Sequence, residues 1–418
     1  MADLADQLAL LRRKIARIDR KYDPKYAGPR PVAPPPAKLP DFSSRIENAV
    51  SGEIVETEHG RHFETERLYE RHRRYGSVDI SDLIDLPPDL LHSLSGGAIP
   101  SAHPEKWAFL DTETTGLAGG SGTYAFLIGI GSIERSGFRV RQFFMRDFAE
   151  ERSQLAAVAA YLSRFDVLIT YNGKTYDQPL LETRFTLARM RHPFARMEHL
   201  DLLFGARRLW KLRLDNCRLT HLEYQILGVE RHGDLPGEVI PSYYFEYVRS
   251  QCALTLVPIF HHNQMDILTL ACLSALVPQC FRDPAQVEVR HGADLLGLAR
   301  WLLAEGRDAD AIALMHRAIE IGLPDALLFR TLFEIASLEK KRKNEAAALA
   351  IFTDLVASPN PCRARAYEQL AKFYEHRERN YAMALEMTIS ALALEPTEEL
   401  RSRRRRLDRK LAKVPRLL

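Results

Sequence analysis

Three short acidic signatures stand in order along the middle of this 418-residue chain. In the first, Asp111 and Glu113 follow an apolar run, and in the second, Asp177 ends the sequence YNGKTYD. In the third, Asp266 follows two histidines at the start of an apolar helical pattern. Each of these four carboxylates stands where an expected helix or strand begins or ends. Four converging carboxylates are what a two-metal site for cleaving phosphodiester bonds needs.

The first signature predicts a pair of carboxylates on one face of a strand. Asp111 and Glu113 are two residues apart, so their side chains point the same way on a strand. Two such neighbours would repel each other unless a divalent cation neutralised them. The apolar run before them and the turn that begins at Thr114 favour this interpretation over a pair of solvated acids. We also include Thr114 among the candidate substrate contacts.

The second signature predicts a sharp turn between a strand and a helix. Asn172 and the glycine after it end the strand. Asp177 stands just before Pro179, a residue favoured in the first turn of a helix. Asp177 can therefore cap that helix, and capping is compatible with metal ligation. We expect Asn172 to hold the loop or a substrate phosphate, while Lys174 is either a phosphate contact or an exposed loop lysine.

The third signature places a histidine beside a carboxylate on a helix. His262 and Asp266 are four residues apart and share a helix face, whereas His261 falls less well on that face. A histidine near the attacking water can serve as general base, because its pKa lies near working pH. Only one of the two histidines can hold that position. His262 is the favoured candidate and His261 the alternative.

Alternating strand and helix patterns predict an α/β domain over residues 101–283. The strands are expected at 107–110, 125–133, 139–145 and 166–170, and the helices at 150–165, at 178–190 and from about His261 onward. Three meandering strands followed by helix, strand and helix are the order found in ribonuclease-H-like domains.

The pattern changes to helices alone over residues 290–418. Small and apolar residues recur around Ala311, Ala348 and Ala384, at spacings of 37 and 36 residues, and each segment follows another amphipathic helix. A helix-pair period near 34 residues is typical of tetratricopeptide repeats. Such repeats expose a concave binding face, so we expect a protein partner there.

The ends of the chain are basic. Residues 1–22 carry a short heptad stripe, which either docks on its own protein or binds a partner helix. A proline-rich linker is expected over 23–41 and an irregular lead-in over 42–100. The run of arginines from Arg401 either neutralises phosphates or lies on a solvated capping helix.

Composition bounds the remaining choices. Hydrophobic residues at 46% allow a sizeable core, and the net charge of +3 does not by itself indicate a nucleic-acid partner. The five cysteines contain no C-x-x-C pair, which argues against a disulfide framework or a zinc site. No uninterrupted apolar run reaches the length of a membrane span, so we expect no membrane partner and a cytoplasmic protein. The sequence does not predict an oligomeric state.

The central domain resembles the DEDD superfamily of 3′→5′ exonucleases, which have a ribonuclease-H-like fold. The matching residues are Asp111, Glu113, Asp177 and Asp266, with Asn172 at its usual distance from the third of them. The sequences YNGKTYDQPLL and HHNQMDILTL are closer still to the YprB-like branch, which often carries C-terminal tetratricopeptide repeats. In one DEDD subgroup a tyrosine stands four residues before the last aspartate, where this chain has His262. In another subgroup a histidine stands five residues before it, where this chain has His261. The pair His-Asn that opens the third motif fits the YprB-like pattern and favours His262.

The resemblance implies a metal-dependent nuclease, in the first place a 3′→5′ exonuclease. It would hydrolyse single-stranded or frayed DNA or RNA with two Mg²⁺ or Mn²⁺ ions. A structure-specific endonuclease is one alternative. The other is a non-catalytic scaffold that binds nucleic acid or protein through its helical repeats.

Overall fold

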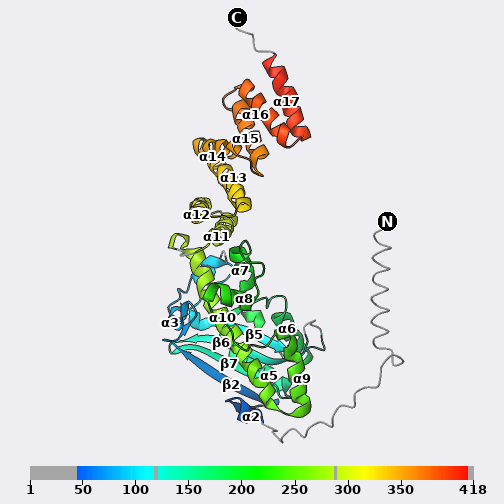
Figure 1. Cartoon of the computed structure of the whole chain (residues 1–418). Coiled ribbons are helices and arrows are strands. Elements are labelled where there is room, and N and C mark those ends of the chain that lie inside the picture. The colour runs from blue at the N-terminus through cyan, green and yellow to red at the C-terminus, as the bar shows by residue number, and fades with distance from the viewer. Residues whose placement is uncertain (1–44, 96, 117–120, 287–289, 413–418) are drawn as a thin grey trace, which may run out of the picture.

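A computed structural model of the chain describes residues 45–95, 97–116, 121–286 and 290–412 (Figure 1). The predicted basic helix at 1–22 and the linker at 23–41 lie outside these residues. The described chain divides into a mixed α/β sheet domain and a C-terminal region made only of paired helices, as the sequence predicts.

A seven-stranded sheet in the order β1-β2-β7-β6-β5-β8-β9 forms the centre of the first domain. Its strands are β1 (Glu53–Thr57), β2 (Gly60–Glu70), β5 (Trp107–Thr114), β6 (Ala125–Glu134), β7 (Gly137–Phe144), β8 (Val167–Thr170) and β9 (Glu198–Asp201). The strands β5, β8 and β9 are parallel, and the other neighbours are antiparallel. β5 is therefore central, between an antiparallel meander and a parallel extension. A separate small sheet pairs β3 (Arg74–Tyr75) with β4 (Val78–Asp79).

The first strand is longer than expected. β5 continues to Thr114, so the first acidic signature lies inside the strand rather than after it. Alternation along β5 then separates two layers. Phe109 belongs to the same core as Ile267 of helix α10 (Val257–Arg282). Leu110 points the other way, into a core with Leu155 of α5 (Glu151–Leu162) and Leu181 of α6 (Asp177–Leu187).

The region expected to be an irregular lead-in contains regular elements, including two strands of the main sheet. β1 and β2 form a hairpin, and β2 extends the sheet by pairing with β7. Polar side chains inside β2 hide its pattern in the sequence. His62 is fully buried and bonds Ser153 and Glu64, both at 2.9 Å, so the strand shows no clean alternation of apolar and polar residues.

The first domain contains further helices. They are α2 (Ile46–Ala49), α3 (Ile80–Ile84), α4 (Leu90–Leu94), α7 (Leu202–Trp210), α8 (Leu219–Leu222) and α9 (Ile240–Ser250). The segment Ala253–Arg282, which contains α10, is long and apolar enough to cross a membrane by length and mean hydropathy alone. However, 72% of its most apolar window is buried inside the protein, so it serves as the central core helix.

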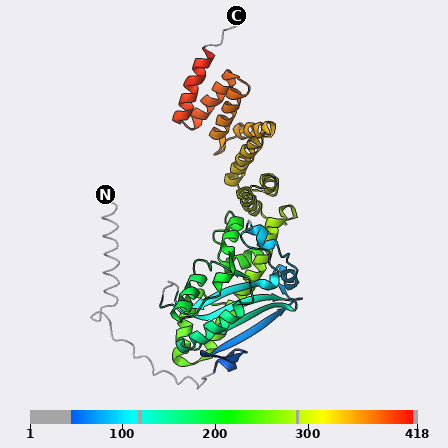
Figure 2. The same cartoon turned by 180° about the vertical axis from the view of Figure 1, so that it is seen from behind.

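The C-terminal helices pack in consecutive pairs and extend away from the sheet domain (Figures 1 and 2). They are α11 (Gly292–Ala304), α12 (Asp308–Ile321), α13 (Asp325–Lys341), α14 (Glu345–Ala357), α15 (Arg363–His376), α16 (Tyr381–Leu394) and α17 (Glu398–Leu411). The hydrophobic core continues from α10 through α11 and α12. A side-chain carbon at Gly297 of α11 would lie 2.4 Å from the carbonyl oxygen of Leu209, so this glycine permits close packing on α7.

The basic run near the C-terminus lies on α17. Arg403, Arg406 and Lys410 converge on the buried carboxylate of Glu375 at 2.6, 2.8 and 3.0 Å. These three cations dock the last helix on α15. The contacts favour the capping-helix interpretation over a run of free phosphate-binding charges.

Candidate active site

The first signature faces α10, as the strand period predicts. Asp111 lies opposite Gly129 in the β5–β6 ladder. A side-chain carbon at Gly129 would lie 2.1 Å from Oδ1 of Asn263, so only glycine leaves room for the helix at this point. Nδ2 of Asn263 donates to the Asp111 carboxylate at 2.8 Å, and its Oδ1 accepts from Gln142 at 2.8 Å. Asn263 therefore fixes the orientation of the Asp111 carboxylate.

The second signature reaches the same strand from the opposite layer. Thr112 points toward α6, and its hydroxyl donates to Oδ1 of Asp177 at 2.5 Å. Asp177 is the first residue of α6 and follows Tyr176, so the expected N-cap role is wrong. Because the carboxylate of Asp177 faces β5, it is directed at the first signature rather than at its own helix.

The loop of the second signature is fastened by a residue that the motifs do not include. Asp201, at the end of β9, is 4% exposed. Its carboxylate accepts the backbone N–H groups of Asn172 at 2.8 Å and Lys174 at 3.2 Å, and also caps α7 through Leu203. Asn172 has a φ of 66°, a left-handed conformation that asparagine tolerates better than most residues. Asp201 therefore holds the turn that brings Asp177 to the sheet.

The candidate substrate contacts differ in their exposure. The side chains of Asn172 and Lys174 are exposed. Thr114 is buried, and its hydroxyl donates to the carbonyl oxygen of Gly116 at 2.9 Å and contacts the Tyr176 hydroxyl at 3.0 Å. Thr114 is therefore engaged inside the loop and is not open to a substrate.

The third signature separates the two histidines. His262 is buried, with Nε2 3.5 Å from Asp266 and Nδ1 2.8 Å from Asp234. His261 is exposed on another face of α10. Asp234 comes from the loop before α9 and does not belong to any of the three signatures. It fixes the imidazole of His262, so that Nε2 is the nitrogen on the side of Asp266.

One arginine joins this group of acids. The guanidinium of Arg231 lies 2.6 Å from Asp266, 2.6 Å from Glu223 and 3.2 Å from Asp234. Glu223 in turn accepts a hydrogen bond from the hydroxyl of Tyr75. Arg231 stands in an irregular segment without a local pattern, so the sequence did not identify it.

Negative charge exceeds positive charge around the first two signatures. Burial, followed by the charges of Asp266 and Glu113, raises the pKa of Asp111 well above its usual value. Burial is also the main reason that the pKa of Glu113 rises to about 8 and that of Asp177 to about 6. Part of this group is therefore protonated at neutral pH unless additional positive charge is present.

The pKa of His262 moves upward as well. Burial alone would lower it, but the hydrogen bond to Asp234 and the charges of Asp266 and Glu113 raise it to about 9. The imidazole is therefore protonated at neutral pH when only the side chains of this chain surround it. In that state His262 and Arg231 are the cations that balance Asp266.

The donor chemistry of the site fits a hard divalent cation. Mg²⁺ and Mn²⁺ prefer carboxylate oxygens, and burial raises the pKa values of Asp111, Glu113 and Asp177, so a bound cation would stabilise their charged forms. Within the described ranges, no three His, Cys, Asp or Glu residues are close enough together to ligate one ion as they stand. Two of the acids are engaged by other side chains, because Asn263 contacts Asp111 and Arg231 contacts Asp266.

Comparison with known proteins shows the family of the chain. Residues 108–277 match the sequence profile of the RNase_H superfamily, and all four carboxylates lie inside that match. The chain is also 32% identical over 355 residues to the protein YprB of Bacillus subtilis (strain 168), with 82% of this chain and 84% of the relative covered. The chain belongs to the YprB family.

Membership of the RNase_H superfamily suggests a nucleic-acid phosphodiesterase. Proteins of this superfamily commonly use divalent metals, and nucleic acid is the substrate class that the domain implies. In this YprB-family chain, the match begins within β5 and ends within α10, so it covers the elements that carry all three signatures.

Proposed function

We propose that this YprB-family protein is a metal-dependent nuclease, and that it acts as a 3′→5′ exonuclease on single-stranded or frayed nucleic acid. One observation carries the proposal. Carboxylates from β5, α6 and α10 gather in one largely buried site, which also contains a histidine held by a further carboxylate. Buried acids with raised pKa values that gather in one place are typical of functional sites.

Asp111, Glu113, Asp177 and Asp266 would hold two Mg²⁺ or Mn²⁺ ions. When bound, such ions lower the pKa of an attacking water and neutralise the charge that develops on the leaving oxygen. The side chains of this chain supply the remaining functions. Asn263 orients Asp111, Thr112 orients Asp177, and Asp201 fixes the loop between β8 and α6.

His262 accepts the proton of the attacking water at Nε2. Its Nδ1 is occupied by Asp234 at 2.8 Å, so Nε2 is the nitrogen that remains for proton transfer. A base must be unprotonated before it acts, and the pKa of about 9 is set partly by the charges of Asp266 and Glu113. Cations bound at those two carboxylates would lower the pKa of His262 toward working pH. His262 would therefore become an effective base when the metal site is occupied.

Two neighbouring pockets offer a path for the substrate strand. A pocket of about 690 Å³ beside Asn172 is lined by Arg207, Lys211 and Arg218. Arg218 also lines a second pocket of about 440 Å³, which reaches His262. Among the described residues, these three cations form no ion pair with a carboxylate. They are therefore free to neutralise phosphates along a strand that ends at the acidic site.

An exposed aromatic residue stands on the second pocket. Tyr224 is 56% exposed and lines the same pocket as Arg218 and His262. Large exposed aromatic side chains beside cations are typical of surfaces that stack single-stranded bases. This combination supports a single-stranded or frayed substrate rather than a duplex held only by its backbone.

A gel assay with a substrate labelled at its 5′ end tests the proposed direction and mode of cleavage. A 3′→5′ exonuclease produces a descending ladder of labelled products. A discrete intermediate band from a substrate with a junction or loop would instead establish a structure-specific endonuclease. Absence of hydrolysis by the intact protein would favour the scaffold alternative, in which the helical region carries the function.

A further inference from the structure

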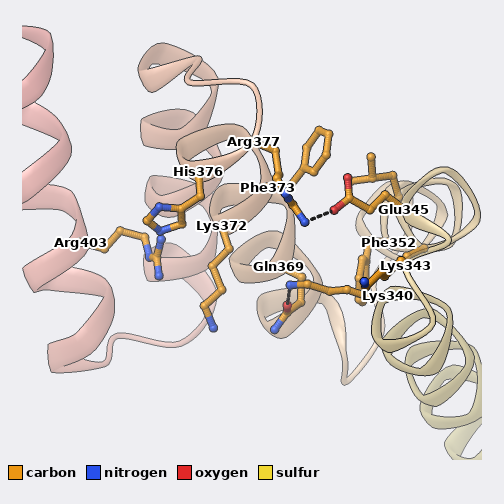
Figure 3. Close-up of a pocket in the computed structure, with 12 residues that line it drawn as sticks. Lys340, Lys343, Glu345, Phe352, Gln369, Lys372, Phe373, His376, Arg377 and Arg403 are labelled. Carbon is orange, nitrogen blue, oxygen red and sulfur yellow. Dashed lines mark hydrogen bonds and ion pairs between the residues drawn. The ribbon is translucent and has the colours of Figure 1, made fainter.

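A basic pocket lies in the helical region, away from the acidic site. It has a volume of about 390 Å³ and is formed by side chains from α13, α14, α15 and α17 and from the turn after α13 (Figure 3). Its lining includes Lys340, Lys343, Leu349, Phe352, Lys372 and Phe373. The pocket touches none of the residues assigned to hydrolysis, so its role is independent of the proposed function.

Positive charge is in excess at the pocket. Five lysine and arginine side chains line it against the single carboxylate of Glu345. That carboxylate is paired with Arg377 at 2.7 Å, as Figure 3 shows. Lys340 bonds only the neutral amide of Gln369, at 2.9 Å. In the part of the chain that the structure describes, neither Lys340 nor Lys343 has a carboxylate partner.

The positively charged side chains around the pocket repel one another. Partial desolvation of its ammonium group, together with the nearby charge of Lys372, lowers the pKa of Lys340. Lys372 itself pairs with Glu368 at 2.6 Å, and Arg403 shares Glu375 with two other cations. An anionic group placed between Lys340 and Lys343 would relieve this repulsion without breaking an existing pair.

The interior of the pocket is apolar. Phe352 is 2% exposed, and Leu349 and Phe373 are half-buried beside it. An apolar floor with a cationic rim fits a ligand that carries an apolar side chain next to negative charge. Helix-pair stacks commonly bind extended peptides in such grooves.

We propose that this pocket binds an acidic peptide segment of a protein partner, with one apolar side chain seated against Leu349 and Phe373 and carboxylates beside Lys340 and Lys343. A peptide fits this pocket better than a nucleic-acid strand for two reasons. The floor offers a recess for one apolar side chain, whereas stacked bases need exposed aromatic faces. The two arginines that line the pocket are already paired with carboxylates of this chain, which leaves lysines as point charges rather than a continuous phosphate track.

Fluorescence anisotropy on the full chain tests the proposal. The probe is a fluorescein-labelled short peptide of aspartates that ends in leucine and phenylalanine. Matched probes replace the aspartates with asparagines or the two apolar residues with alanines, and an oligothymidylate of similar length represents nucleic acid. The protein variants are the double substitution Lys340→Ser with Lys343→Ser and the control Lys341→Ser, an exposed neighbour on α13 that does not line the pocket.

The acidic–apolar peptide is expected to bind the wild type and Lys341→Ser equally, and both altered peptides are expected to bind more weakly. The double variant should lose about tenfold in affinity, since each exposed charge pair contributes a few-fold. Both lysines are exposed, so the variant keeps the helical circular-dichroism signal of the wild type. No binding by the wild type, or equal binding by the double variant, would overturn the proposal. Tighter binding of oligothymidylate that is lost in the double variant would also overturn it and assign the pocket to nucleic acid.

Discussion

The guanidinium of Arg231 lies 2.6 Å from the carboxylate of Asp266 and also contacts Glu223 and Asp234. One buried cation thus forms ion pairs with three carboxylates at the end of the candidate active site. The same Asp266 faces His262 at 3.5 Å. A divalent cation that binds Asp266 must therefore bind beside Arg231 and His262 or displace them from this carboxylate.

Removing Arg231 should destabilise the protein. Arg231→Ala leaves Glu223, Asp234 and Asp266 without their common cation, and breaking a buried ion pair on one side costs about 3–5 kcal/mol. The free energy of unfolding from urea denaturation measures the loss. Arg404→Ala is the matched control, because Arg404 forms only an exposed pair with Asp408 on α17 and should cost about 0.5 kcal/mol or less. A loss for Arg231→Ala as small as that of the control would contradict the account of the buried network.

Asn263 should matter for hydrolysis more than for folding. Asn263→Ala removes the donor that orients Asp111, and loss of such an orienting partner typically lowers activity about 10–100-fold. Ser274→Ala serves as control, since Ser274 is buried on the same helix and its hydroxyl donates to the backbone carbonyl oxygen of Ala271. The rate of substrate hydrolysis is the readout, with thermal unfolding as a check on the fold. Equal rates for the two variants would remove Asn263 from the site.

The stability of the metal-free protein should fall as the pH rises from about 6 to about 9. The pKa of Glu113 is raised from 4.5 to about 8, and that of His262 from 6.5 to about 9. Between each pair of values the folded state binds more protons than the unfolded state, so the free energy of unfolding decreases with pH. The stabilisation is present below the unfolded pKa and is lost as the pH passes through the folded pKa.

Urea denaturation in EDTA across that pH range measures this dependence. The slope should be smaller in Glu113→Gln, which cannot take up the proton. It should also be smaller with Mn²⁺ present, because bound cations replace the protons. A free energy of unfolding that rises with pH in EDTA would show that the folded state does not raise the pKa values of Glu113 and His262.

The cations of the proposed strand path should affect substrate binding more than the chemical step. Arg207→Ala and Arg218→Ala each remove a charge without altering the acidic site, so KM should rise several-fold while kcat changes little. The rise should shrink at higher salt, because phosphate contacts are screened. Arg249→Ala, at the end of α9 and outside both pockets, is the control. If kcat fell and KM stayed constant, these arginines would not be strand contacts.

The sequence predicted many of the elements and the relative placement of several candidate residues, because both depend on local periodicity. A spacing of two on β5 placed Asp111 and Glu113 on one face, and a spacing of four on α10 brought His262 beside Asp266. The helix pairs of the C-terminal region followed from their repeat spacing. The assignment of those helices to tetratricopeptide repeats and of the site to the DEDD class stays a prediction.

The residues that sequence reasoning missed act through contacts between distant segments. Arg231 and Asp234 lie in an irregular segment, and only the fold brings them to α10. For Asp201 the sequence gives a weak indication, since an aspartate between a short strand and a helix is typical of an N-cap. The hairpin of β1 and β2 was missed because buried polar partners such as His62 and Glu64 interrupt its alternation.

The most direct test of the account is hydrolysis of 5′-labelled single-stranded DNA and RNA with Mn²⁺, Mg²⁺ or EDTA, by the wild type and Asp111→Asn. Asp354→Asn, an exposed change on α14, is the matched control. We expect metal-dependent hydrolysis by the wild type and the control, and a loss of at least about 100-fold in Asp111→Asn. Asp111→Asn should also fold normally, because it removes a charge whose burial is unfavourable. Undiminished hydrolysis in folded Asp111→Asn, or hydrolysis that persists in EDTA, would contradict the central claim.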